Sequence, residues 1–347
     1  MQESILVIII HNKMEEEMDL SSLNSIAQSM VAPNKGILAA DESTPTIGKR
    51  FATIDTESTE SSRQTYRNML FTAPDISDYI SGVILFDETI RQATNDGVPF
   101  AEYLTSLGIV PGIKVDKGAK DLPMHPGEKV TEGLDGLRER LEEYYSLGAR
   151  FAKWRAVIEI GDNQPSMACI DVNAHALARY SALCQEAKMV PIVEPEILMD
   201  GNHSIETCFE VTTKVLDHVF KVLEDQKVAL NGIILKPNMV ISGTDASDRA
   251  DVATVATATV KCLSENVPDE VPGIAFLSGG QTSEEATAHL SAMNEMGPHP
   301  WQLSFSYGRA LQAQPLNAWS GADENLKLGQ DAFLKRSRLN RLARTGN

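Results

Sequence analysis

Eight short apolar segments recur along the chain, and each ends in polar or charged residues. They are residues 36–43, 81–88, 111–118, 151–161, 190–196, 232–238, 273–280 and 301–308. Their apolar residues run on without polar alternation, which is typical of strands covered on both faces, as in a parallel sheet. The pattern therefore predicts eight buried parallel strands.

Helical patterns lie between several of these strands. Residues 133–148 place four side chains on one helical face before Gly148 ends the pattern: Leu134, Leu137, Leu141 and Tyr144. Residues 205–226 repeat the pattern with Ile205, Phe209, Leu216, Phe220 and Leu223. Residues 282–297 open with Thr282 and Glu285 at capping-box spacing.

A strand followed by a helix, about eight times, is the rhythm of a (β/α)8 TIM barrel. We expect one α/β domain of this kind over residues 19–333. The alternative is a doubly wound open sheet, but no GxGxxG motif follows any of these strands. An N-terminal extension (1–18) would precede the barrel, and a basic C-terminal tail (334–347), a helix fading into a mobile end, would follow it.

Composition narrows the class of protein. Hydrophobic residues make up 42% and charged residues 23% of the 347 residues, as in a folded globular protein. The formal net charge of −17 disfavours a nucleic-acid surface. The apolar run at 5–10 is too short for a membrane span and its acidic flank is wrong for a signal peptide. We expect a cytoplasmic protein without nucleic-acid or membrane partners.

Metal and cofactor motifs are missing from the sequence. The four cysteines, at positions 169, 184, 208 and 262, form no CxxC pair, which favours reduced thiols. The histidines show neither HxH nor HExxH spacing. We therefore expect neither a metal site nor a cofactor.

Catalytic groups of such barrels gather at the carboxyl ends of the strands. Three lysines and several carboxylates stand there, which predicts a shared mouth rather than a set of unrelated ion pairs. The strand ends carry Asp41, Glu42, Ser43, Asp87, Glu88, Lys114, Asp116, Lys153, Arg155, Glu194, Glu196, Lys236, Ser278, Gly279, Gly280, Tyr307, Gly308 and Arg309.

Lys236 is the candidate nucleophile, because it follows the apolar run Ile233–Leu235 and precedes Pro237. A lysine with an ordinary pKa of about 10.4 is protonated and inert, whereas burial and a second cation disfavour its charged form. Lys153 or Lys114 would supply that cation. Such an amine forms a Schiff base with a ketone, which permits cleavage of a carbon–carbon bond. The alternative is a buried structural pair between Lys236 and Glu194.

Two anion sites are expected around this lysine. The loops after the seventh and eighth strands, with Ser278–Gly280 and Arg309, match the usual phosphate site of barrels. A second site would use Ser43, Lys49, Arg50 and Lys114, although an exposed helix start explains the first three equally simply. Two separated phosphate sites imply a sugar bisphosphate.

The sequence resembles the class I (Schiff-base) fructose-1,6-bisphosphate aldolases. The matching pieces are VAPNKGILAADEST, GIKVDKG, FAKWR, VPIVEPEIL, ILKPNMV, FLSGGQ and FSYGRALQ, in family order from about residue 20 to residue 320. The resemblance implies a (β/α)8 barrel that reversibly splits fructose 1,6-bisphosphate in glycolysis and gluconeogenesis. It also implies a homo-oligomer, commonly a tetramer.

The resemblance assigns roles to individual residues. Lys236 would form the Schiff base and Lys153 would tune it; Glu194 would shuttle protons with Glu196 close by, and Asp41 would take the C4 hydroxyl proton. The 1-phosphate would bind Ser278, Gly279, Gly308 and Arg309. The 6-phosphate would bind Ser43, Arg50 and Lys114, assisted by Arg63 and Arg155.

Three departures from the family pattern stand out, and one is that the first dozen residues have no obvious counterpart. Pro45 and Thr46 stand where many members have Gly-Ser, and the chain ends RLARTGN where animal members end in a tyrosine. A basic tail folding over the substrate is one hypothesis for this end. Other readings are a transaldolase-like transferase, a preference for fructose 1-phosphate or sedoheptulose bisphosphate, and a scaffold with a vestigial site.

Overall fold

The computed structural model describes residues 20–346, and within them eight parallel strands close into a barrel. The strands are β1 Gly36–Ala39, β2 Ile80–Leu85, β3 Val110–Lys114, β6 Phe151–Ile158, β7 Val190–Ile197, β8 Ile234–Leu235, β9 Gly273–Phe276 and β10 Gln302–Tyr307. Each strand pairs with the next along the chain, and β10 returns to β1. The predicted (β/α)8 barrel is confirmed, and the open-sheet alternative is wrong.

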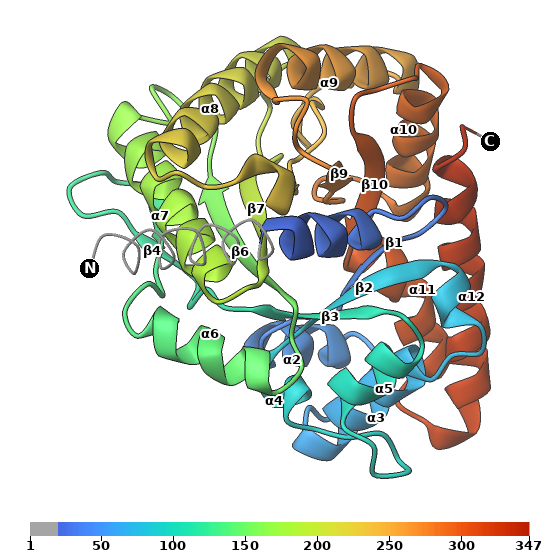
Figure 1. The fold of residues 1–347 in the computed structure, drawn as a ribbon. Helices are drawn as coiled ribbons and strands as arrows, with labels where there is room; N and C mark the ends of the chain where they lie inside the picture. Colours follow the sequence, from blue (N-terminus) through green and yellow to red (C-terminus); the bar gives the residue numbers. More distant parts are fainter. Residues whose placement is uncertain (1–19, 347) are drawn as a thin grey trace, which may run out of the picture.

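Helices surround the strands (Figure 1). They are α2 Thr44–Ala52, α3 Glu60–Phe71, α4 Asp87–Ile90, α5 Phe100–Ser106, α6 Leu137–Ser146, α7 Met167–Glu186, α8 Ile205–Asp225, α9 Val252–Asn266, α10 Ser283–Glu295, α11 Arg309–Trp319 and α12 Leu326–Ala343. Short 3-10 turns (Ile76–Asp78, Leu230–Gly232 and Asp323–Asn325) and a hairpin of β4 Ala119–Asp121 with β5 Lys129–Thr131 complete the set. Each helix in the described part of the chain is too short or too polar to cross a membrane.

The local signals account for several helix ends. Thr282 and Glu285 form the predicted capping box of α10. Leu134 lies before α6 rather than on it, because Gly136 takes a left-handed conformation (φ 64°) and the helix starts after it. On α8, Phe209 is only half-buried, whereas the other four apolar positions are buried.

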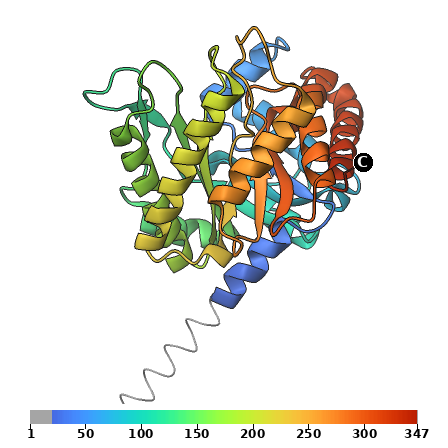
Figure 2. The same cartoon turned by 90° about the horizontal axis from the view of Figure 1, so that it is seen from above.

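One end of the barrel is closed by the chain itself. Residues 20–30 are helical, and Leu23, Ala27 and Met30 pack with the barrel interior, which includes Phe151 and Ile234. Figure 2 shows this helix below the barrel, at the amino-terminal ends of the strands. Apolar side chains therefore fill the barrel interior at that end.

The C-terminal residues differ from the expected tail. Residues 334–343 belong to α12, which continues through the expected boundary at residue 334. Arg336 and Arg344 are buried rather than solvated. Arg344 donates to Ser304 Oγ (2.9 Å), and to Gln302 Oε1 (2.9 Å) at the start of β10, opposite the mouth. The basic residues therefore join the helix to the barrel. The expected extension (1–18) lies outside the described residues.

Candidate active site

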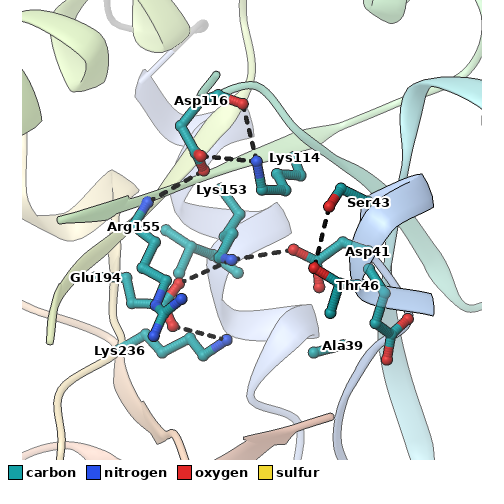
Figure 3. A network of polar contacts seen from close by, with 12 residues as sticks. Ala39, Asp41, Ser43, Thr46, Lys114, Asp116, Lys153, Arg155, Glu194 and Lys236 are labelled. Atoms are coloured by element: carbon teal, nitrogen blue, oxygen red, sulfur yellow. Dashed lines mark hydrogen bonds and ion pairs between the residues drawn. The ribbon is translucent and has the colours of Figure 1, made fainter. Parts of the chain in front are cut away.

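Four charged side chains form a connected chain at the mouth of the barrel (Figure 3). Lys236 Nζ lies 3.1 Å from Glu194 Oε1, and Lys153 Nζ lies 3.2 Å from Glu194 Oε2. Lys153 Nζ also donates to Asp41 Oδ2 at 3.0 Å. All four residues are at least nine-tenths buried. The four strand ends that sequence analysis put at one mouth do meet there.

Lys236 directly follows the last residue of β8 and is buried. Ile233, Ile234 and Leu235 are completely buried, and the backbone N–H of Lys236 donates to Val193 O at 2.8 Å, one step beyond the strand. Pro195 on β7 has no N–H to donate to the Lys236 carbonyl, so the ladder between β7 and β8 stops here. The lysine side chain is therefore fixed at its root and only 4% exposed.

Electrostatic interactions set the charge state of two of these four side chains, Asp41 and Lys153. Burial alone would raise the pKa of Asp41, but the ammonium groups of Lys153, Lys236 and Lys114 outweigh it and hold that pKa well below its usual range. Burial would lower the pKa of Lys153, but Asp41, Glu194 and Asp116 raise it well above its usual range. Asp41 is thus a carboxylate and Lys153 an ammonium at neutral pH.

The expected second cation is Lys153 rather than Lys114. Lys153 and Lys236 contact the two oxygens of the same carboxylate, that of Glu194. Lys114 is instead held by Asp116, with its Nζ 2.6 Å from Oδ1 and 2.8 Å from the backbone oxygen of the same residue.

The second glutamate of the EPE motif has a different partner. Glu196 Oε2 accepts from Arg155 Nε, and the backbone N–H of Arg155 reaches Asp116 Oδ2 at 3.4 Å. Burial would lower the pKa of Arg155, but the Glu196 carboxylate outweighs it and raises that pKa above the ordinary arginine value. A Cβ added at Gly279 would lie 3.0 Å from Glu196 Oε1, so this pair borders the loop after β9. The structure thus places Glu194 against the two buried lysines and Glu196 against Arg155.

The predicted anion loops lie on neighbouring strand ends. Ser278 and Gly279 directly follow Leu277, the residue after β9, and Gly308 is the N-cap of α11, with Arg309 as its first residue. Free backbone N–H groups at such a helix start favour an anion. Arg309 Nη2 contacts Gln281 O at 3.5 Å, which joins the two loops.

Residues predicted for the other phosphate occupy the loop after β1 and α2. Ser43 is the N-cap residue of α2, and its Oγ lies 3.0 Å from Thr46 Oγ1. Arg50 Nη1 donates to Glu42 Oε1. Arg50 Nη2 lies only 3.7 Å from where a Cβ of Gly308 would be, so Arg50 lies beside the neighbouring loop after β10 rather than across the mouth from it.

Several expected mouth residues point elsewhere. Arg63 is held by both oxygens of Glu88 (2.7 and 2.6 Å). Asp87 pairs with Arg91 at 2.9 Å. Tyr307 is fully buried, and its hydroxyl donates to Ala286 O at 2.9 Å on α10. The expectation that Tyr307 lines the mouth is therefore wrong, because successive strand side chains point to opposite faces.

Glu42 also points away from the cluster formed by Lys236, Glu194, Lys153 and Asp41. Besides Arg50, its carboxylate accepts from Arg67 Nη2 at 2.7 Å and from Gln312 Nε2 at 2.8 Å. This buried network lies between α2, α3 and α11.

Ser306 is a buried barrel residue that sequence analysis did not single out. It pairs in register with Ile37, which belongs to the barrel-interior cluster, and it is 1% exposed. Its hydroxyl has no hydrogen-bond partner among the described residues. The alternation in QLSFSY, with Ser304 and Ser306 opposite Phe305 and Tyr307, was the available signal.

Metal ligands do not gather at this mouth. Within residues 20–346, no group of three or more His, Cys, Asp or Glu side chains is arranged to hold a metal ion. The chemistry available to the described mouth is that of amines, carboxylates, hydroxyls and guanidinium groups.

Comparison with known proteins agrees with this geometry. Residues 22–347 match the family model described as fructose-bisphosphate aldolase class-I. A probable fructose-bisphosphate aldolase class 1 of Xanthomonas axonopodis is 58% identical, over 95% of this chain and 99% of its own length. The cytosolic fructose-bisphosphate aldolase 4 of Arabidopsis thaliana is 53% identical, over 90% of this chain and 80% of its own length.

A solved structure shows the same fold. It is a fructose-bisphosphate aldolase from Plasmodium falciparum, crystallised with TRAP and a small-molecule inhibitor. It superposes with a TM-score of 0.93 at 49% identity, covering 94% of this chain and 95% of that one. By family model, sequence and fold, this chain belongs to the class I fructose-bisphosphate aldolases.

Proposed function

We propose that this chain reversibly cleaves fructose 1,6-bisphosphate through a Schiff base on Lys236. The observation that carries the proposal is the buried chain Lys236–Glu194–Lys153–Asp41 at the carboxyl ends of the strands. The products are dihydroxyacetone phosphate and glyceraldehyde 3-phosphate, and the reaction belongs to glycolysis and, in reverse, to gluconeogenesis.

Imine formation begins at Lys236. Glu194, 3.1 Å away, takes a proton from its ammonium group, and the free amine attacks the C2 carbonyl. The resulting carbinolamine loses water when Glu194 returns a proton to its hydroxyl. Lys153, an ammonium on the other oxygen of Glu194, stabilises the carboxylate between these transfers.

Cleavage of the C3–C4 bond needs a base at the C4 hydroxyl. Asp41 is ionised, and Lys153 at 3.0 Å fixes its orientation. When Asp41 takes the C4 proton, the C4–O bond becomes a carbonyl and the C3–C4 electron pair moves into the iminium, which becomes an enamine. The aldehyde leaves, the enamine is protonated at C3, and hydrolysis releases dihydroxyacetone phosphate.

Phosphate groups orient the substrate across the mouth. Ser278, Gly279, Gly308 and Arg309 are the proposed 1-phosphate ligands, with the free hydroxyl of Ser306 on the same side. Ser43 and Lys114 are proposed for the 6-phosphate. Arg50 is proposed for the 6-phosphate as well, and its Nη2 lies beside Gly308 of the 1-phosphate loop. Arg155 and Glu196 border the loop after β9.

A coupled assay tests the activity. Fructose 1,6-bisphosphate cleavage is followed through triose phosphate formation, in wild type and in Lys236→Met, with and without EDTA. We expect turnover in wild type, no effect of EDTA, and loss of turnover in the variant. Turnover by Lys236→Met, or its loss on chelation, would refute the proposal. Fructose 1-phosphate and sedoheptulose 1,7-bisphosphate in the same assay define the substrate range.

We further propose a cytoplasmic homotetramer. Relatives named cytosolic and the composition of the chain support the location. Light scattering of the purified protein tests the assembly, and a monomer at micromolar concentration would contradict it.

A further inference from the structure

We propose that Asn238 is a positioning residue that holds the catalytic ends of β7 and β8 in register. The inference rests on the proposed Schiff-base function and concerns how Lys236 is kept against Glu194. Asn238 is 2% exposed and lies two residues after Lys236, outside any strand.

The backbone ladder between these strands ends before the catalytic residues do. Its last bond runs from Lys236 N to Val193 O. The register of β7 with β8 puts Glu194 opposite Lys236, and Pro195, the next residue of β7, has no N–H to donate back to the Lys236 carbonyl. β7 goes on to Ile197 and carries Glu194 and Glu196 on this extension. Among the described residues, β7 beyond Glu194 makes no main-chain hydrogen bond to the segment that follows Lys236.

The Asn238 side chain replaces the missing ladder bond. Its Oδ1 accepts from the backbone N–H of Ile197 at 3.2 Å. Its Nδ2 donates to Thr212 Oγ1 (3.2 Å) on α8 and to Met239 O (3.1 Å). The amide thereby ties three segments together, and its orientation is fixed by partners on both sides.

This bond lies close to the reacting pair along both chains. Glu194 precedes Ile197 by three residues, and Lys236 precedes Asn238 by two. The 3.1 Å contact between Lys236 and Glu194 depends on how far these two strand ends slide past each other. The proposed phosphate ligands stand on other strands, so a slip here would disturb chemistry rather than substrate binding.

The experiment compares Asn238→Ala with a matched control on the same segment. Thr259 Oγ1 accepts from Val240 N at 2.9 Å, so Thr259→Val also loses a buried bond to the chain after β8, but one that does not reach β7. For Asn238→Ala we expect imine trapping by borohydride and kcat to fall about 10- to 100-fold with KM nearly unchanged. Thr259→Val should lose stability without this kinetic change.

Thr212→Val is the milder variant, in case Asn238→Ala fails to fold. It leaves the bond to Ile197 but removes the anchor on α8, so a smaller fall in trapping rate is expected. Wild-type trapping rates in Asn238→Ala and in Thr212→Val, or an equal kinetic loss in Thr259→Val, would overturn the inference. Absence of trapping in wild type would instead refute the proposed function.

Discussion

Lys236 Nζ lies 3.1 Å from Glu194 Oε1, with both side chains almost fully buried. A purely structural ion pair would show the same contact. The difference lies in Lys153, which binds the other oxygen of Glu194 and one oxygen of Asp41. Because Lys153 stays charged, the Glu194 carboxylate keeps an ammonium partner on the oxygen that does not face Lys236.

Glu194→Gln should abolish most of the activity. The amide keeps the shape of the side chain but cannot take the proton of Lys236, so kcat should fall about 10²- to 10⁴-fold. Steady-state kinetics with fructose 1,6-bisphosphate measure this loss.

Glu196→Gln is the matched control. In the described structure Glu196 pairs with Arg155 and forms no ion pair with Lys153 or Lys236. Its kcat should fall about tenfold or less. Equal losses in the two variants would contradict the separate roles of these glutamates.

Asp41→Asn should block cleavage but not imine formation. The variant lacks the base for the C4 hydroxyl, so kcat for fructose 1,6-bisphosphate should fall about 10²- to 10⁴-fold. Dihydroxyacetone phosphate, which needs no C3–C4 cleavage, should still be trapped on Lys236 by borohydride. Failure of that trapping would place Asp41 in imine formation instead.

Two buried histidines should weaken the fold in mild acid. Burial lowers the pKa of His203 below 6.5, and both ring nitrogens lack partners among the described residues. Burial also lowers the pKa of His289, with Arg249 in the same direction and Glu285 opposing. The unfolded chain then binds more protons, so stability is complete above pH 6.5 and declines as the pH falls below it.

Urea unfolding of wild type and of the double variant His203→Asn/His289→Asn measures this effect. Between about pH 7.5 and pH 5.5, wild type should lose more free energy of unfolding than the variant. Parallel curves would show that the two histidines do not contribute.

Arg344→Met should destabilise the protein without changing KM. Arg344 donates to Ser304 and Gln302 and to the backbone oxygens of Ala32 and Lys35. Losing these bonds should cost about 2–4 kcal/mol of unfolding free energy. Thermal unfolding and steady-state kinetics check both halves; a raised KM with unchanged stability would restore the hypothesis of a basic tail over the substrate.

Much of the fold was predictable because its signals are local. Each of the eight apolar runs became a barrel strand, since a strand covered on both faces is largely apolar. The helix docking of residues 334–343 was not predictable in this way. Its many basic residues favour a solvent-exposed helix. Arg336 and Arg344 are buried because they bond to backbone oxygens and side chains of segments that are distant in the sequence.

The candidate site was predictable to the level of strand ends but not of side-chain direction. Asp41, Lys153, Glu194 and Lys236 meet as expected, because parallel strands bring their carboxyl ends together. Glu42 and Tyr307 stand at strand ends too, yet they face the helices. The positions of Asn238 and Arg50 depend on contacts with neighbouring elements that are distant in the sequence, which no local pattern encodes.

Borohydride trapping tests the central claim most directly. The protein is incubated with dihydroxyacetone phosphate and borohydride, digested, and the modified peptide is identified by mass spectrometry. The account predicts one reduced adduct on Lys236, none in Lys236→Met, and loss of activity in proportion to labelling. An adduct on Lys153 or Lys114, or full activity without any adduct, would contradict it.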